Sequence, residues 1–170
     1  YFDVEKDVDI YVGTFSKSLG SIGGFVSTKK DIAEYIRHKA SAFIFTAALP
    51  PASVAGVLEG LDILANDSKR RKRLHENTTF IKRAFFELGI QVNNNHVPIV
   101  PIQIGDEALT LYMNRLLFDD AVFAGVAVSP VVPPLKAMIR TSYTSEHTKK
   151  DLDRILTSFE KNLKKIGILP

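Results

Sequence analysis

The most chemically distinctive part of the chain is residues 13–24, GTFSKSLGSIGG. It places Thr14, Ser16 and Lys17 within four positions, and three glycines follow. Hydroxyls and unobstructed backbone N–H groups suit a phosphate, and glycine permits close approach of the backbone. The lysine could act as a phosphate counter-ion or, desolvated at a strand end, as a nucleophile toward an aldehyde. A flexible turn with a solvated lysine is the structural alternative. The segment is not a P-loop or a dinucleotide-binding loop, because the patterns GxxxxGK[ST] and GxGxxG are absent.

The other candidates for catalysis are weaker. Asp119 and Asp120 are adjacent, and neighbours on a helix do not share a face, so they do not predict a catalytic carboxylate pair. Neither Ser18 nor Ser21 lies in a GxSxG elbow. The absence of cysteine excludes a thiolate zinc site and a cysteine nucleophile. The histidines lack the spacing typical of metal ligands; they are His38, His75, His96 and His147.

The composition is that of a globular protein, with 45% hydrophobic and 24% charged residues in 170. The formal net charge of +3 depends on one run of five basic residues, 69–73, without which the charge would be negative. An RNA-binding module is the rival interpretation of that run. Such a basic run more commonly marks the solvent-exposed start of a helix. No aromatic residues lie between these basic residues to stack on nucleic-acid bases. We therefore expect no nucleic-acid partner.

No apolar run approaches the roughly 18 residues of a membrane-spanning helix. The chain begins at Tyr1 rather than Met, in the approach to an expected strand, which suggests a piece of something longer. The lack of cysteine fits a reducing compartment, so we expect a cytoplasmic location.

The hydrophobic patterns predict a strand–helix mixture, α/β in the first part and α+β in the second. Pro50–Pro51 marks a helix start, and Gly89 marks the end of the helix after it. The last helix has the clearest signals, with Thr148 and Asp151 as a capping-box variant. The expected strands are 8–13, 25–28, 43–46, 97–104, 125–129 and 137–143, and the expected helices are 29–39, two between 51 and 88, 106–118 and 148–166.

The segment DVDIYVGTFSKSLGSIGGFVS closely resembles the lysine segment of the α-oxoamine synthase family of pyridoxal phosphate enzymes. The resemblance continues through FIFTAALPP (43–51) and MIRTSYTSEHTKKDLDRIL (138–156), and so covers essentially the whole chain. Phe15 and Ser16 are most similar to the serine palmitoyltransferase branch of that family. The resemblance implies the end of a fold-type I large, cofactor-binding domain over residues 1–75. It also implies a small C-terminal α+β domain over residues 76–170.

The resemblance also implies a role for individual residues. Lys17 matches the lysine that forms a Schiff base with pyridoxal 5'-phosphate and moves the proton at Cα. Thr14 and Ser16 match residues that bind the cofactor phosphate. Thr46 matches a position that reaches the phosphate of the neighbouring subunit's cofactor, which implies a homodimer with a shared active site. Arg140 matches the arginine that receives the substrate carboxylate, for which its planar fork is suited.

The implied reaction is the decarboxylative condensation of an amino acid with an acyl-CoA. The family's long N-terminal portion is absent here; it supplies the ring stacked on the cofactor and the aspartate that pairs with the pyridine nitrogen. We therefore expect the intact parent to be the enzyme and the isolated chain to be inactive. An aminotransferase of the same fold is the alternative activity, and a non-catalytic dimerisation module is the alternative of another class.

Overall fold

The computed structural model describes residues 2–93 and 95–170. The chain divides into two compact units, Tyr1–Asp67 and Ser68–Pro170, and each is described by itself. The assignment of residues 1–75 to a large domain and of 76–170 to a small domain stays a prediction.

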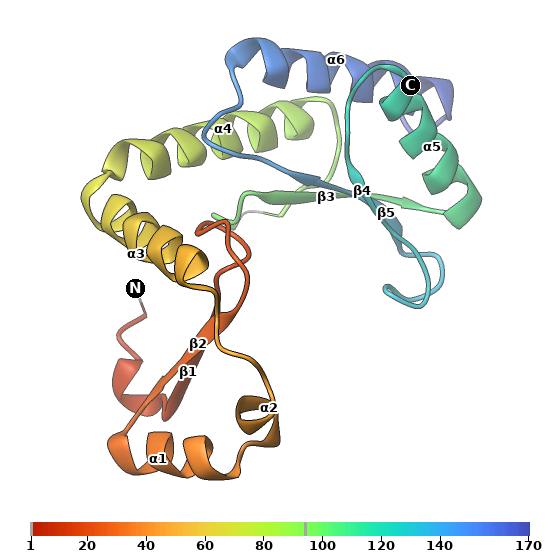
Figure 1. Cartoon of the computed structure of the whole chain (residues 1–170). Coiled ribbons are helices and arrows are strands. Elements are labelled where there is room, and N and C mark those ends of the chain that lie inside the picture. The colour runs from red at the N-terminus through yellow and green to blue at the C-terminus, as the bar shows by residue number, and fades with distance from the viewer. Residues whose placement is uncertain (1, 94) are drawn as a thin grey trace. The chain divides into compact units, whose positions relative to one another are not determined.

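Unit 1 contains one β-hairpin that carries the lysine segment (Figure 1). Strand β1 (Ile10–Thr14) pairs antiparallel with β2 (Gly24–Thr28), and the register places Thr14 opposite Gly24. The expected strands at 8–13 and 25–28 are therefore confirmed. The loop that joins them, residues 15–23, contains Lys17.

Four helical segments accompany the hairpin: η1 (Glu5–Asp7), α1 (Lys30–Lys39), α2 (Ser41–Ile44) and α3 (Pro51–Asn66). Helix α3 begins at Pro51, as the sequence predicts, because the missing N–H of proline costs nothing in the first helical turn. Val57 is the one buried large apolar residue among the described residues of this unit, and many of its aromatic and aliphatic side chains are exposed.

The expected strand at 43–46 is wrong. Residues 41–44 form α2, in which the N–H groups of Phe43 and Ile44 both donate to the carbonyl of Ala40. The N–H of Phe45 donates to Ser41 in the same way. A short apolar run does not distinguish a buried strand from a helical turn, and here local bonds satisfy the backbone in place of a strand partner.

Unit 2 is built on a three-stranded antiparallel sheet in the order β3-β5-β4. The strands are β3 (Ile99–Gly105), β4 (Gly125–Ala127) and β5 (Ala137–Ser142), so the expected strands of this half are confirmed. Strand β3 lies at the edge of the sheet, where its one proline, Pro101, is tolerated.

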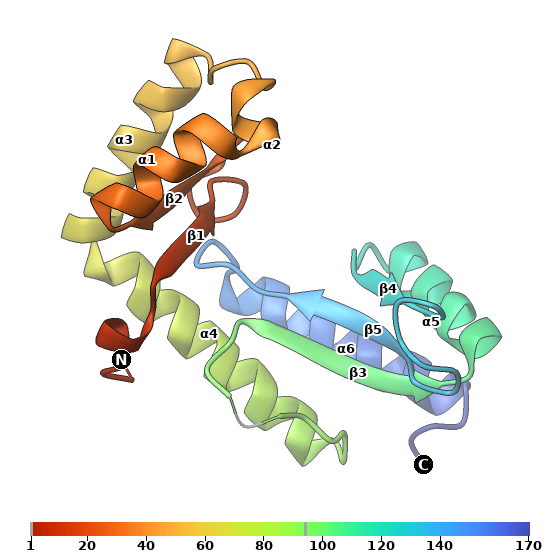
Figure 2. The same ribbon diagram turned by 90° about the horizontal axis from the view of Figure 1, so that it is seen from below.

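Three helices complete unit 2: α4 (Ser68–Glu87), α5 (Glu107–Asp119) and α6 (Lys149–Lys165). Figures 1 and 2 show α4 and α6 side by side against one face of the sheet. Apolar side chains of all three helices join those of the sheet in one core that includes Phe85, Ile102, Met113, Ile139 and Phe159. The sheet therefore presents its other face away from these helices, and alternate residues of β5 belong to that face.

The ends of α4 and α6 follow their sequence signals. Gly89 has a φ of 84°, the left-handed conformation that commonly follows a helix. Thr148 and Asp151 form the predicted capping box at the start of α6. In the part of the chain that the structure describes, no helix combines the length and the apolar character needed to cross a membrane.

Candidate functional site

The loop around Lys17 is closed by its own backbone. Phe15 N–H donates to the carbonyl of Gly23 (3.0 Å), and Ser21 N–H donates to the carbonyl of Phe15 (2.9 Å). Gly20 N–H then donates to the carbonyl of Lys17 (3.1 Å), which folds residues 17–20 into a turn. These three bonds fix the position of the lysine backbone at the end of the hairpin.

Two hydroxyl groups stand together at the same end. Thr14 Oγ1 and Ser16 Oγ lie 2.9 Å apart in a hydrogen bond that either can donate. Ser16 N–H also donates to Thr14 Oγ1 (3.3 Å), and the Thr14 hydroxyl reaches the Gly23 carbonyl at 3.4 Å. These bonds bring the predicted positions Thr14 and Ser16 together at the end of the strand, with both hydroxyls exposed, and Lys17 follows them in the same loop.

The Lys17 side chain is exposed. It has no hydrogen bond or ion pair with any of residues 2–93 or 95–170. A pocket of about 640 Å³ lies beside the loop, between residues 19–22, Ser16 and the first turns of α3. The amine thus has no partner among the described residues, and its neighbour Ser16 lines a shallow, open depression.

Two glycines close to the hydroxyl pair cannot be replaced without moving the loop. Gly23 has a φ of 86°, and a Cβ there would lie 2.6 Å from Leu49 Cδ2. A Cβ on Gly24 would collide with the backbone oxygen of Gly13. The absence of side chains at these positions therefore lets the hairpin and Leu49 pack closely beside Thr14.

Thr46 is not brought to this group by any contact within the described chain. Its hydroxyl donates to the carbonyl of Ala42, four residues earlier, at the end of α2. It is exposed, so it is available to a second subunit, which is the role that the family resemblance implies for it.

Arg140 lies in the middle strand of the sheet of unit 2. Its neighbours across the sheet are Pro101 on β3 and Gly125 on β4. The proline contributes only its compact ring, and the glycine has no side chain. Arg140 is exposed, whereas Ile139 and Thr141 on either side of it are buried in the core. Among the described residues it has no ion-pair or hydrogen-bond partner through its guanidinium, so its fork is free for a carboxylate.

Asn77 is a residue that sequence reasoning missed. From α4 its Nδ2 donates to the carbonyls of Thr144 (3.1 Å) and His147 (3.0 Å), and thereby fixes the loop that follows the Arg140 strand. Within that loop, Thr144 N–H donates to His147 Nδ1 (3.0 Å). No sequence signal marks Asn77, because its two partners lie 67 and 70 residues away.

Comparison with known proteins assigns this arrangement to a class. The family model for aminotransferase class I and II matches residues 1–159, and the chain belongs to that family. It is 42% identical to serine palmitoyltransferase of Bacteriovorax stolpii over 170 residues, which are 100% of this chain and 40% of that protein. It is 38% identical to 8-amino-7-oxononanoate synthase of Thermoanaerobacter pseudethanolicus over 99% of this chain and 43% of that protein.

A solved structure described as serine palmitoyltransferase with a pyridoxal phosphate internal aldimine superposes with a TM-score of 0.92. The two sequences are 28% identical, and the match covers 98% of this chain and 42% of that one. The chain thus spans about two-fifths of the length of the relatives that it matches.

Proposed function

We propose that this chain supplies the lysine-bearing part of a pyridoxal phosphate-dependent acyltransferase. The enzyme would condense an amino acid with an acyl-CoA and release carbon dioxide and free CoA, giving an α-oxoamine. The observation that carries the proposal is the hydrogen-bonded pair of hydroxyls on Thr14 and Ser16 at one hairpin end, followed directly by Lys17, whose exposed amine has no partner among the described residues. The similarity to serine palmitoyltransferase and 8-amino-7-oxononanoate synthase supports it.

The residues present fit pyridoxal phosphate. Thr14 and Ser16 offer two hydroxyl donors for a phosphate, and Lys17 offers an amine for an aldehyde. When bound, the cofactor supplies an electron-withdrawing ring that stabilises negative charge at the amino-acid Cα.

The remaining chemistry belongs to this chain's own residues. The Lys17 amine would hold the cofactor and, once released by the amino acid, take the proton from Cα. Arg140 would bind the amino-acid carboxylate through its planar fork. We further propose a homodimer in which Thr46 contributes its hydroxyl to the phosphate bound by the partner, which its exposed position permits.

Borohydride reduction followed by peptide mapping tests the lysine assignment. In the purified protein that carries this chain, the reduced cofactor should be recovered on the peptide containing Lys17. Lys17→Ala should remove the label, whereas the matched exposed-lysine control Lys30→Ala should keep it. Recovery of the label on another lysine in the unsubstituted protein would overturn the assignment.

Product analysis tests the reaction class. Incubation with an amino acid and an acyl-CoA should release a free thiol and carbon dioxide in equal amounts. An aminotransferase would instead form an oxo acid without thiol release, and that outcome would replace the acyltransferase proposal while leaving the Lys17 assignment intact.

A further inference from the structure

A second pocket lies in unit 2, between α4 and the segment that precedes β3. Its volume is about 520 Å³, within the range of small-molecule sites. Four of the residues that line it carry basic side chains: His75, Lys82, Arg83 and His96. None of its described lining residues is an aspartate or a glutamate. The two charged side chains in the wall of this basic pocket, Lys82 and Arg83, are therefore both cationic.

Lys82 is the most buried of these bases, with only 9% of its surface exposed. Its ammonium donates to Asn93 Oδ1 (3.2 Å), to the carbonyl of Asn95 (2.5 Å) and to Asn95 Oδ1 (2.8 Å). All three acceptors are neutral, and desolvation lowers the pKa of the amine. No carboxylate of the described residues pairs with it, so its positive charge is left uncompensated beside the pocket.

The other donors converge on the same space. His75, Thr79 and Arg83 follow one another at four-residue intervals and so share one face of α4. The ring of His96 stands against that of His75, with the centroids 5.3 Å apart and the planes inclined at 40°. Neither imidazole has a hydrogen-bond partner within the described part of the chain. The Arg83 Nε bonds Glu87 at 2.8 Å, which leaves the two terminal nitrogens of the guanidinium.

We propose that the basic pocket binds a phosphate-bearing small molecule. A phosphate presents several acceptor oxygens to donors arriving from different directions, which the two imidazoles and the guanidinium supply. A divalent cation would be repelled by Lys82 and Arg83, although two facing imidazoles alone would suit one. Phe86, 72% exposed on the pocket wall, offers an apolar surface for an organic group attached to the phosphate.

Histidine NMR with inorganic pyrophosphate as the probe tests this proposal in the purified protein that carries this chain. The ring signals of His75 and His96 should shift with one shared saturation curve. The signals of His38, which lies in unit 1 and does not line the basic pocket, should stay unchanged and so serve as the internal control. Absence of a shift at His75 and His96 would overturn the proposal.

A pair of arginine variants supplies the matched control. Arg83 and Arg115 are both exposed and both pair through Nε with an acid four residues later, at 2.8 and 3.0 Å. Arg83→Gln should weaken pyrophosphate binding about tenfold, because one charge-assisted contact is lost. Arg115→Gln should leave the dissociation constant unchanged. Equal effects of the two substitutions would show that only the total charge matters, and would refute a specific phosphate site in the basic pocket.

A histidine variant separates an effect on binding from an effect on folding. His96→Gln should weaken pyrophosphate binding, whereas its thermal unfolding midpoint should equal that of the unsubstituted protein. If Zn²⁺ shifts the two histidine signals and pyrophosphate does not, the pocket is a cation site and the proposal is wrong.

Discussion

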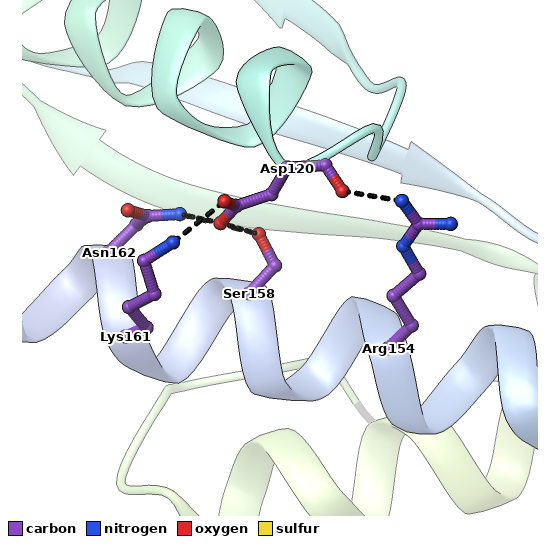
Figure 3. A network of polar contacts seen from close by, with 5 residues as sticks. All are labelled: Asp120, Arg154, Ser158, Lys161 and Asn162. Carbon is purple, nitrogen blue, oxygen red and sulfur yellow. Dashed lines mark hydrogen bonds and ion pairs between the residues drawn. The ribbon is translucent and has the colours of Figure 1, made fainter.

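Asp120 and Asn162 are joined by a hydrogen bond of 2.8 Å between the asparagine Nδ2 and the carboxylate Oδ2, across 42 residues of sequence (Figure 3). Ser158 Oγ donates to the same oxygen at 2.8 Å, and Lys161 Nζ lies 2.7 Å from the other one. The Asp120 carbonyl accepts from Arg154 Nη2 at 2.9 Å. One residue just past the end of α5 thus ties that end to more than two turns of α6.

Replacing Asp120 by alanine should lower the stability of unit 2. Ser158 and Asn162 are both buried, so the substitution leaves the Ser158 hydroxyl without its acceptor and leaves the Asn162 amide with only its longer bond to Ser158 Oγ (3.3 Å). Thermal unfolding followed by circular dichroism should show a lower midpoint for Asp120→Ala. The neighbouring Asp119→Ala removes only an exposed pair with Arg115 and should change the midpoint much less. Equal shifts for the two variants would contradict the role assigned to Asp120.

The same carboxylate should make unit 2 sensitive to acid. Hydrogen bonds from Lys161, Ser158 and Asn162 lower the pKa of Asp120 from 3.8 to about 2. Because the folded-state pKa is depressed, this contribution to the free energy of unfolding is complete above the ordinary pKa and is lost as the pH falls from 3.8 toward 2. Urea unfolding at several pH values should show a smaller loss over this range in Asp120→Asn than in the unsubstituted protein.

Arg140 is predicted to set the affinity for the amino-acid substrate. Arg140→Lys keeps the charge but loses the planar fork, so the KM for the amino acid should rise about tenfold, with a smaller change in the KM for acyl-CoA. Steady-state kinetics on the purified protein that carries this chain measures both constants. Arg115→Lys is the control for an exposed arginine elsewhere in unit 2. An unchanged KM for the amino acid would remove Arg140 from the substrate site.

Local signals of the sequence predicted the fold well where they were strong. The capping box of Thr148 and Asp151 is reproduced, because both partners lie within one helical turn. The strand expected at 43–46 failed because its composition suits a strand while its backbone is satisfied by helical bonds to Ala40 and Ser41. Composition alone does not say whether a partner strand is within reach.

The candidate site likewise contains residues that local sequence predicts and residues that it does not. Thr14, Ser16 and Lys17 could be predicted as a group because they are contiguous and a hairpin holds them. Lys82 gave no signal, since its partners lie 11 and 13 residues away in an irregular segment. The contact of His75 with His96 likewise needs the path of the chain after α4, which spacing between histidines does not reveal.

Thr14 is predicted to hold the cofactor phosphate through its hydroxyl. Thr14→Val keeps the branched shape that suits a strand but removes the donor, so the dissociation constant for pyridoxal phosphate should rise about tenfold. Thr14→Ser retains the hydroxyl and should bind nearly as well as the unsubstituted protein. Cofactor absorbance during titration of the protein that carries this chain gives both constants. If valine and serine behave alike, the hydroxyl does not contact the phosphate.

Tyr143 is predicted to carry a dispensable hydroxyl. Its side chain is 4% exposed, and its Oη has no hydrogen-bond partner among the residues that the structure describes. The nearby Thr141 hydroxyl donates instead to the carbonyl of Val100 at 2.8 Å, and burial raises the pKa of the phenol. Tyr143→Phe removes a buried polar group that gains nothing from the fold, so the free energy of unfolding should stay the same or rise by about 1 kcal/mol.

Urea unfolding of Tyr143→Phe beside Tyr11→Phe checks that expectation. Tyr11 Oη donates to the Glu5 carbonyl at 2.8 Å, so its removal should cost stability where that of Tyr143 does not. A loss of more than about 1 kcal/mol in Tyr143→Phe would mean that a buried water satisfies the phenol, because only a hydroxyl with a partner contributes that much.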